Sequence, residues 1–262
     1  MRSADDWARL LASGRPIEEP VALVVAHPDD ETLWAGAALG RLRSATLVLV
    51  TDGAPEDMAD ARRLGFATRA DYAATRAEEL QTAIAALEGS LSLQRYEVPD
   101  QGATTCVADI ASRLIENCPD VMAFLTHPYE GGHPDHDAVA LAVRLAADRL
   151  GVPVVEFACY ARFDRSRVFA RFVPDARCPE HVRSLNDGDR ERIERALRAH
   201  ASQASVFGSW RPTVERWRAA PRYDFTQPPP GEAVLYDEFG WAMTGARWRA
   251  ATREAAEAVT CR

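Results

Sequence analysis

Short apolar runs alternate with longer segments of helical period over about the first 160 residues of the chain. The apolar runs predict strands and the longer segments predict helices. The expected strands are residues 21–26, 46–51, 91–98, 121–126 and 152–160, and the expected helices are residues 31–43, 69–87, 107–116 and 134–150. This βαβα order predicts a Rossmann-like α/β fold, with a mostly parallel sheet and helices on both faces. Functional groups in such sheets lie beyond the carboxyl ends of the strands.

The alternation ends at about residue 161. Residues 167–173 alternate like a strand, residues 187–202 resemble a charged amphipathic helix, and residues 227–231 (QPPPG) predict an extended loop. We expect residues 1–262 to form one domain, with a catalytic core at about 20–160 and a variable C-terminal region at about 161–262 that shapes the substrate site. A small separate C-terminal lobe is the alternative.

Charge and composition exclude several classes of function. The net charge is −8, and every basic residue is arginine, so a Schiff-base lysine and a P-loop lysine are both excluded. An acidic chain is not typical of nucleic-acid binders. The apolar runs are too short for a membrane span, the N-terminus lacks a signal-peptide pattern, and the five cysteines contain no C-x-x-C pair, so we expect a cytoplasmic protein with reduced thiols. The alanine-rich, lysine-free composition favours a bacterial source, and no pattern predicts the oligomeric state.

The sequence Ala26-His27-Pro28-Asp29-Asp30-Glu31 stands where the first expected strand gives way to a helix. His27 and Asp30 are three residues apart across this turn, so both side chains can reach one point while Asp29 faces its open side. Pro28 restricts the turn to few conformations. The alternative is that both aspartates cap the helix and His27 makes a hydrogen bond in the core.

A second polar cluster, HPYEGGHPDH at residues 127–136, follows another expected strand and leads into another helix. It contains three of the six histidines of the chain. His133 and His136 repeat the spacing of three residues, so both can project from the first helical turn toward one crevice. Because parallel strands end at a common edge of the sheet, we expect the two clusters to form a single site.

These residues match the ligand set of a catalytic zinc, which takes three protein ligands and keeps one position for water. We expect His27, Asp30 and His136 to bind one zinc ion per chain, which would lower the pKa of a bound water from about 15.7 toward 7. Asp29 is then free to accept the proton of the water. His133 can stabilise an oxyanion and protonate a leaving amine. The pattern therefore predicts a hydrolase that acts on a carbonyl group.

The pair AHPDDE and HPDH resembles the PIG-L/LmbE superfamily of zinc-dependent deacetylases, which remove acetyl groups from N-acetylglucosamine-type amino sugars. The resemblance covers roughly residues 20–160. It implies that His27, Asp30 and His136 bind zinc, that Asp29 is the general base and that His133 assists the tetrahedral intermediate. It also implies a small-molecule amino-sugar substrate, whose attached group the sequence does not identify.

Weaker features of the same resemblance concern substrate contacts. Arg76, in an R-x-x-E helix, resembles an arginine that reaches the sugar, and Asp100 resembles a strand-end acid that holds sugar hydroxyls. The alternatives are an exposed helix arginine paired with an acid and an ordinary turn. We expect His127 to support a metal ligand, although a substrate contact or a strand-end role stays open, and Asp135 to orient His133 or cap the helix.

The tryptophans of the C-terminal region allow two interpretations: they line a pocket for a glycoside or its lipophilic aglycone, or they belong to the core. They are Trp210, Trp217, Trp241 and Trp248.

Three other functions remain possible for the same residues. A zinc amidase that cleaves a larger amide, such as a thiol conjugate, would use identical groups. A non-catalytic relative would bind a metal or a sugar but would not need Asp29. A non-heme iron oxygenase would use Asp29 rather than Asp30 beside His27, but that class uses an antiparallel barrel, which the alternation of strands and helices does not favour.

Overall fold

The computed structural model describes residues 2–231 and 233–260. Its main sheet has the strand order β3 (Leu91–Asp100), β2 (Ala45–Pro55), β1 (Val21–Val25), β4 (Phe124–Thr126), β5 (Val154–Phe157), β9 (Val214–Ala219) and β8 (His181–Ser184). The five strands from β3 to β5 are parallel, whereas β9 runs antiparallel to both β5 and β8. The predicted α/β fold with a mostly parallel sheet is confirmed.

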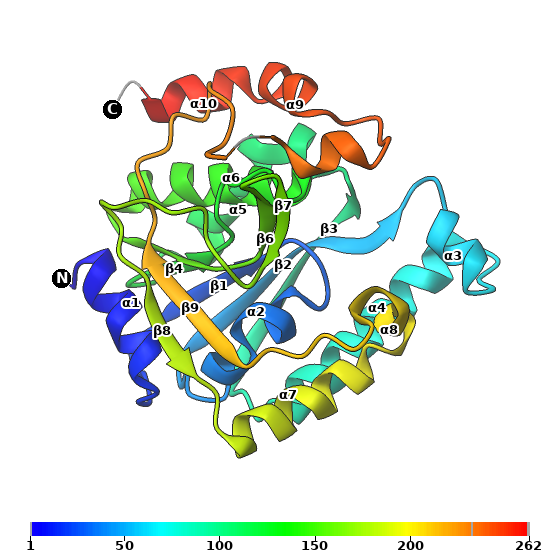
Figure 1. Cartoon of the computed structure of the whole chain (residues 1–262), viewed down its shortest axis with the longest axis horizontal. Helices are drawn as coiled ribbons and strands as arrows, with labels where there is room; N and C mark the ends of the chain where they lie inside the picture. Colours follow the sequence, from blue (N-terminus) through cyan, green and yellow to red (C-terminus); the bar gives the residue numbers. More distant parts are fainter. Residues whose placement is uncertain (1, 232, 261–262) are drawn as a thin grey trace.

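Helices cover both faces of this sheet (Figure 1). One face carries α1 (Ala4–Ser13), α2 (Asp30–Leu39), α4 (Arg69–Ala86) and α7 (Asp187–Ala199), and the other carries α5 (Val107–Asn117), α6 (Pro134–Leu150), α9 (Gly245–Ala251) and α10 (Arg253–Thr260). The central strand β1 is buried along its whole length. Its Val21, Leu23 and Val25 enter the first core, and Ala22 and Val24 enter the second. A strand buried on both faces explains why its sequence is a continuous apolar run.

Several predicted boundaries agree closely with the structure. Helix α6 spans the predicted residues 134–150 and ends at Gly151, whose φ of 71° is the left-handed conformation that closes many helices. Helix α2 ends at Leu39, four residues earlier than predicted. The remaining short elements are α3 (Ala59–Arg63), α8 (Ala204–Phe207) and the 3-10 turns Ala103–Cys106, Ala201–Gln203 and Leu235–Glu238.

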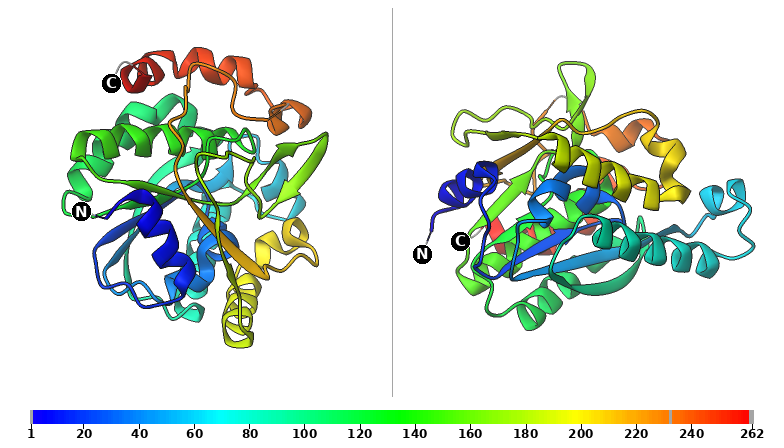
Figure 2. Two further views of the ribbon diagram at one scale, coloured as in Figure 1. Left: turned by 60° about the vertical axis from the view of Figure 1, so that its left-hand side comes forward. Right: turned by 90° about the horizontal axis from the view of Figure 1, so that it is seen from below.

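The C-terminal region departs further from the prediction. Residues 167–173 do not form one strand: β7 (Ser166–Phe169) pairs with β6 (Tyr160–Phe163) in a separate hairpin (Figure 2), and the chain then turns away. Ala170 takes a positive φ of 51°, and the backbone N–H of Val173 donates to Glu130, so these contacts replace the expected strand. The predicted helix at 187–202 is confirmed as α7 with a following 3-10 turn. Helix α1 and strands β8 and β9 were not predicted.

The helices and the cysteines bear on the environment of the chain. Within the described residues, no helix combines the length and the apolar character needed to cross a membrane. The described cysteines Cys106, Cys118, Cys159 and Cys178 are free thiols, and Cys261 lies outside the described residues.

Candidate active site

Both polar clusters lie at the carboxyl edge of the parallel strands. His27 follows the end of β1 by two residues, and His127 directly follows β4. Strand β3 ends at Asp100, and His133 is the N-cap residue of α6. Because β3, β2, β1 and β4 are neighbours in one parallel sheet, residues more than 100 positions apart meet at this edge.

The turn between β1 and α2 holds Asp29 in an unusual conformation. Its φ is 141° and its side chain makes no capping hydrogen bond to α2. A non-glycine residue in a sparsely populated region costs of order 1–3 kcal/mol, and such strain often occurs at functional sites. Asp30 instead accepts hydrogen bonds from the backbone N–H of His27 at 2.8 Å and from Trp34 at 3.0 Å. Helix capping therefore does not account for either carboxylate.

His27, Asp30 and His136 converge, as the sequence predicted. One potential ligand atom from each residue lies within 4.8 Å of the others, and each side chain is buried. His27 Nδ1 is 3.4 Å from Asp30 Oδ2, and His136 Nε2 is 3.3 Å from Asp30 Oδ1. His136 Nε2 makes no hydrogen bond to any described residue, although it is buried. A buried nitrogen without a hydrogen bond, facing a carboxylate and a second imidazole, fits a divalent cation with nitrogen and oxygen ligands.

Acidic groups hold the other side of the His27 ring. Its Nε2 lies 3.2 Å from Asp135 Oδ2 and 3.4 Å from Asp100 Oδ1, which turns Nδ1 toward Asp30. Burial opposes protonation of His27, but Asp100 and Asp135 raise its pKa well above the ordinary value. A carboxylate on the second nitrogen is the usual way to orient a metal-binding histidine.

The side chain of Asp135 thus contacts His27, and only the Asp135 backbone donates a hydrogen bond to His133, the histidine that we expected Asp135 to orient. The Asp135 carboxylate accepts hydrogen bonds from the backbone N–H groups of Gln101 and Ala103, at 2.7 and 3.1 Å, and its nearest oxygen is 4.0 Å from His133 Nδ1. His133 Nδ1 instead accepts the backbone N–H of Asp135 at 3.1 Å. With Nδ1 occupied as an acceptor, the neutral His133 ring carries its proton on Nε2. His133 is thus a hydrogen-bond donor through Nε2.

Arg76 is buried against Asp29 and is not on an exposed helix face. Its Nη2 donates to Asp29 Oδ2 at 2.8 Å and to the carbonyl of Pro28 at 2.7 Å, and its Nη1 donates to the carbonyl of Gly53 at 2.6 Å. Burial raises the pKa of Asp29 to about 7, and the positive charge of Arg76 opposes this rise.

The ring of His127 packs against the imidazole of His136. The two rings stack at a centroid distance of 3.9 Å with an interplanar angle of 14°. His127 Nε2 accepts the backbone N–H of Ala26 at 2.9 Å, and its Nδ1 lies 3.3 Å from Cys159 Sγ. Burial lowers the pKa of His127 to about 3. Because both nitrogens are engaged by protein groups, this geometry favours the supporting role among the expected ones.

His200 is a site residue that sequence reasoning missed. It lies at the end of α7, is fully buried, and places Nε2 at 3.2 Å from Glu31 Oε1. The other oxygen of Glu31 accepts the backbone N–H of Asp29 at 2.9 Å. His200 therefore reaches the strained Asp29 through Glu31. No local pattern connects residues 169 positions apart, so only the folded chain reveals this contact.

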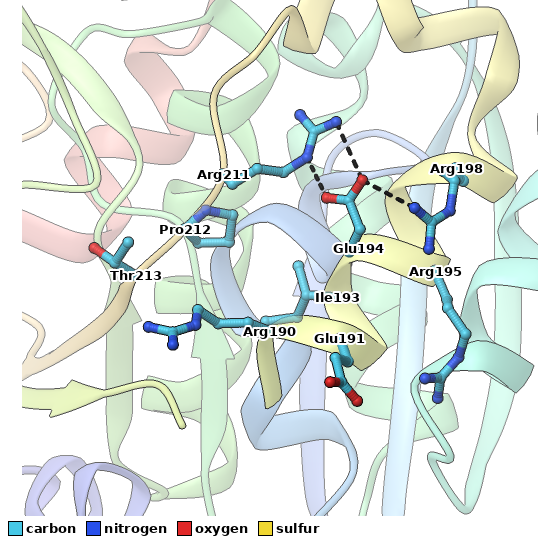
Figure 3. Close-up of a pocket in the computed structure, with 9 residues that line it drawn as sticks. All are labelled: Arg190, Glu191, Ile193, Glu194, Arg195, Arg198, Arg211, Pro212 and Thr213. Atoms are coloured by element: carbon cyan, nitrogen blue, oxygen red, sulfur yellow. Dashed lines mark hydrogen bonds and ion pairs between the residues drawn. The ribbon is translucent and has the colours of Figure 1, made fainter. Parts of the chain in front are cut away.

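A cleft of about 780 Å³ opens beside these residues. Its lining includes Asp100 and Trp241, and the Trp241 ring meets the His133 ring edge-on at 5.0 Å. A second hollow, of about 530 Å³, lies along α7 (Figure 3). There Arg198 and Arg211 both bind Glu194, and no histidine or cysteine is among the residues that line the hollow. The cleft, and not this hollow, adjoins the candidate metal ligands.

Comparisons with known proteins show which family and which solved structures this chain resembles. Residues 22–147 match the PIG-L family model, described as GlcNAc-PI de-N-acetylase. No curated protein sequence matches the chain. The A40926 pseudoaglycone deacetylase Dbv21 is 21% identical over 76% of this chain and 96% of that chain, with a TM-score of 0.57. The zinc-inhibited form of teicoplanin deacetylase Orf2 is 18% identical over 76% and 97%, with a TM-score of 0.57.

A third solved structure is N,N'-diacetylchitobiose deacetylase from Pyrococcus horikoshii, which is 15% identical over 73% of this chain and 74% of that chain, with a TM-score of 0.50. At such identities the similarity to solved structures establishes a common fold. The family match covers both polar clusters, so residues 22–147, which hold the candidate ligands, resemble the PIG-L family.

Proposed function

We propose that this protein is a zinc-dependent hydrolase that removes an N-acetyl or other N-acyl group from an amino sugar within a glycoside or conjugate. The observation that carries the proposal is the convergence of His27, Asp30 and His136 beside Asp29 and His133, in a region that resembles a family named for a de-N-acetylase. The deacetylase neighbours, one of them crystallised in a zinc-inhibited form, add support.

The donor set fits zinc, because two imidazoles and one carboxylate are its common ligands in catalytic sites. His27 would bind through Nδ1, since Asp100 and Asp135 occupy its other side, and His136 through the buried Nε2 that lacks a hydrogen bond to the described residues. When bound, zinc supplies Lewis-acid polarisation of the acyl group and of a water molecule.

Asp29 is the base that takes the proton from the attacking water. Arg76 binds Oδ2, and no described residue donates a hydrogen bond to Oδ1, so Oδ1 is the oxygen available for the proton. Arg76 thus acts through Asp29, and we propose this positioning role in place of direct sugar binding. Asp100 lines the cleft, which supports the proposal that it accepts hydrogen bonds from sugar hydroxyls, the role that the family resemblance implies.

His133 donates a hydrogen bond from Nε2 to the oxygen of the tetrahedral intermediate. Because its Nδ1 is occupied by the Asp135 backbone N–H, loss of the Nε2 proton would leave an anionic ring. The proton for the leaving amine is therefore the one that Asp29 accepted from water. This assignment modifies the sequence expectation that His133 protonates the amine.

Metal content and amine release test the proposal together. We expect about one zinc per chain by elemental analysis and release of acetate from simple N-acetylglucosaminides, both lost on treatment with a chelator and restored by zinc. Bound zinc without release from any sugar amide would direct the assay to larger amides, which is the alternative function. Absence of metal after reconstitution would contradict the site assignment.

The iron-oxygenase alternative is disfavoured by the mostly parallel sheet.

A further inference from the structure

Trp241 lies outside the region matched by the family model, yet it stands beside the candidate catalytic residues. Its ring meets His133 at 5.0 Å with an interplanar angle of 70°. Trp217 and Trp248 are completely buried, whereas Trp241 is partly exposed and lines the cleft. Trp210 is also partly exposed, but it packs against the first core and does not line the cleft, so of these four tryptophans Trp241 fits the pocket interpretation.

The position of Trp241 is held by contacts from the β6–β7 hairpin. Phe239 packs against Trp241 at 4.8 Å, and the guanidinium of Arg167 lies 5.2 Å from the centre of the Phe239 ring. Arg162 and Arg167 both bind Glu238. These contacts join residues 238–241 to the two-stranded sheet of β6 and β7. The position of Trp241 in the wall of the cleft therefore depends on this hairpin.

The cleft combines an apolar wall with a charged rim. Val98, Pro99, Trp241 and Met243 supply apolar surface, while Glu56, Asp57 and Arg247 supply charge. The cleft also contains Asp100, whose Oδ1 is 3.4 Å from His27 Nε2, so its inner end reaches the candidate metal ligands. A volume of about 780 Å³ lies in the upper part of the range for sites that take drug-sized ligands, about 300–1,000 Å³, and exceeds the need of one acetylated sugar.

On the basis of the proposed function, we propose that Trp241 is a specificity-determining residue. Its indole forms one wall of a subsite that takes an apolar, ring-containing group carried by the amino sugar. In the proposed reaction His133 contacts the acyl group, and the Trp241 ring contacts His133. A group attached to the sugar that extends into the cleft therefore meets the indole, because Trp241 lines the cleft. Flat apolar rings pack on an indole face, whereas a methyl group covers little of it.

The experiment compares 4-nitrophenyl and methyl N-acetyl-β-glucosaminides, which carry the same amide. Wild type, Trp241→Ala, Trp241→Phe and the control Leu64→Ala are assayed for kcat and KM. Leu64 is a 36% exposed apolar residue that neither lines the cleft nor belongs to the β6–β7 hairpin. We expect wild type and Leu64→Ala to prefer the aryl substrate, and Trp241→Ala to lose about tenfold of that preference, mainly through KM, which corresponds to about 1.4 kcal/mol. Trp241→Phe should retain most of it.

Binding of the deacetylated products separates this proposal from the proposed reaction. If wild type hydrolyses neither glycoside, calorimetric titration with 4-nitrophenyl and methyl glucosaminide measures the same preference without turnover. Tighter binding of the aryl compound to wild type than to Trp241→Ala would support the subsite. An unchanged aryl-to-methyl ratio in Trp241→Ala, or no binding of either compound to wild type, would overturn it.

Discussion

The family-matched region and the C-terminal region reach the same site by different architecture. Residues 22–147 form parallel strands whose ends carry the candidate ligands, the proposed base and the proposed accessory histidine. Residues 161–262 add antiparallel strands and helices, and from them come His200, Arg218 and Trp241. The first region supplies groups that can react, and the second supplies groups that bury, hold or border them. The position of the candidate site residues at the strand ends therefore depends on supporting residues that are distant in the sequence.

The largest expected effect lies within the matched region. We expect His136→Ala to lose zinc and activity together, because it removes the imidazole whose buried Nε2 faces Asp30. His133→Ala should keep zinc and lose rate, since His133 stands outside the ligand set. Elemental analysis alongside amine release measures both. Full zinc content in His136→Ala would remove it from the ligand set.

Asp29→Asn should leave zinc binding intact and lower kcat by about 10²–10⁴-fold, the usual contribution of general acid–base catalysis. The amide keeps the shape of the side chain but cannot accept the proton of water. Zinc content and steady-state kinetics measure the two properties. Turnover close to that of wild type would favour another base.

Arg218 tests whether the C-terminal region stabilises the site. Its guanidinium is 2% exposed and binds Glu130 at 2.8 Å and Glu156 at 2.9 Å. We expect Arg218→Met to lower the free energy of unfolding by about 3–5 kcal/mol, because it leaves two buried carboxylates without their cation. Urea unfolding measures the loss. Arg177→Met, at an exposed ion pair with Asp175, is the control and should change little, so equal losses would contradict the prediction.

A variant of His200 tests whether a residue of the C-terminal region also affects the rate of the reaction. We expect His200→Ala to lower kcat by roughly tenfold with KM unchanged, because Glu31 loses the partner that helps it hold the Asp29 backbone. This loss is smaller than the roughly hundredfold loss that a 1 Å misplacement of a reacting group can cause. His181→Ala, at a histidine paired with Asp5, is the control. Reduced stability with an unchanged kcat would make His200 purely structural.

The last prediction concerns the pH dependence of stability. Burial raises the pKa of Glu215 on β9 from 4.5 to about 7. Between these values the folded state binds more protons than the unfolded state, so this residue lowers the free energy of unfolding as pH rises, with no further change above about pH 7. We expect Glu215→Gln to flatten that decrease in urea unfolding series, and Glu254→Gln, at an exposed residue of α10, to leave it unchanged. A slope unaffected by Glu215→Gln would contradict the assignment.

Much of the site was predictable because its residues occupy strand ends. The alternation of strands and helices placed His27, Asp30 and His136 at one edge of a parallel sheet, and the structure brings them within 4.8 Å. Arg76 was harder: its position on α4 was clear, but its burial against Asp29 depends on how α4 packs on the sheet.

The sequence by itself determined the parallel core and the groups that carry the chemistry, because both follow from local periodicity and from short motifs at strand ends. Only the tertiary structure decided the antiparallel β9, the contact of Asp135 with His27, the path from His200 to Asp29, and the place of Trp241 in the cleft. These features rest on contacts between residues far apart in the chain. Such contacts leave no periodic signal, since their geometry depends on the packing of whole elements.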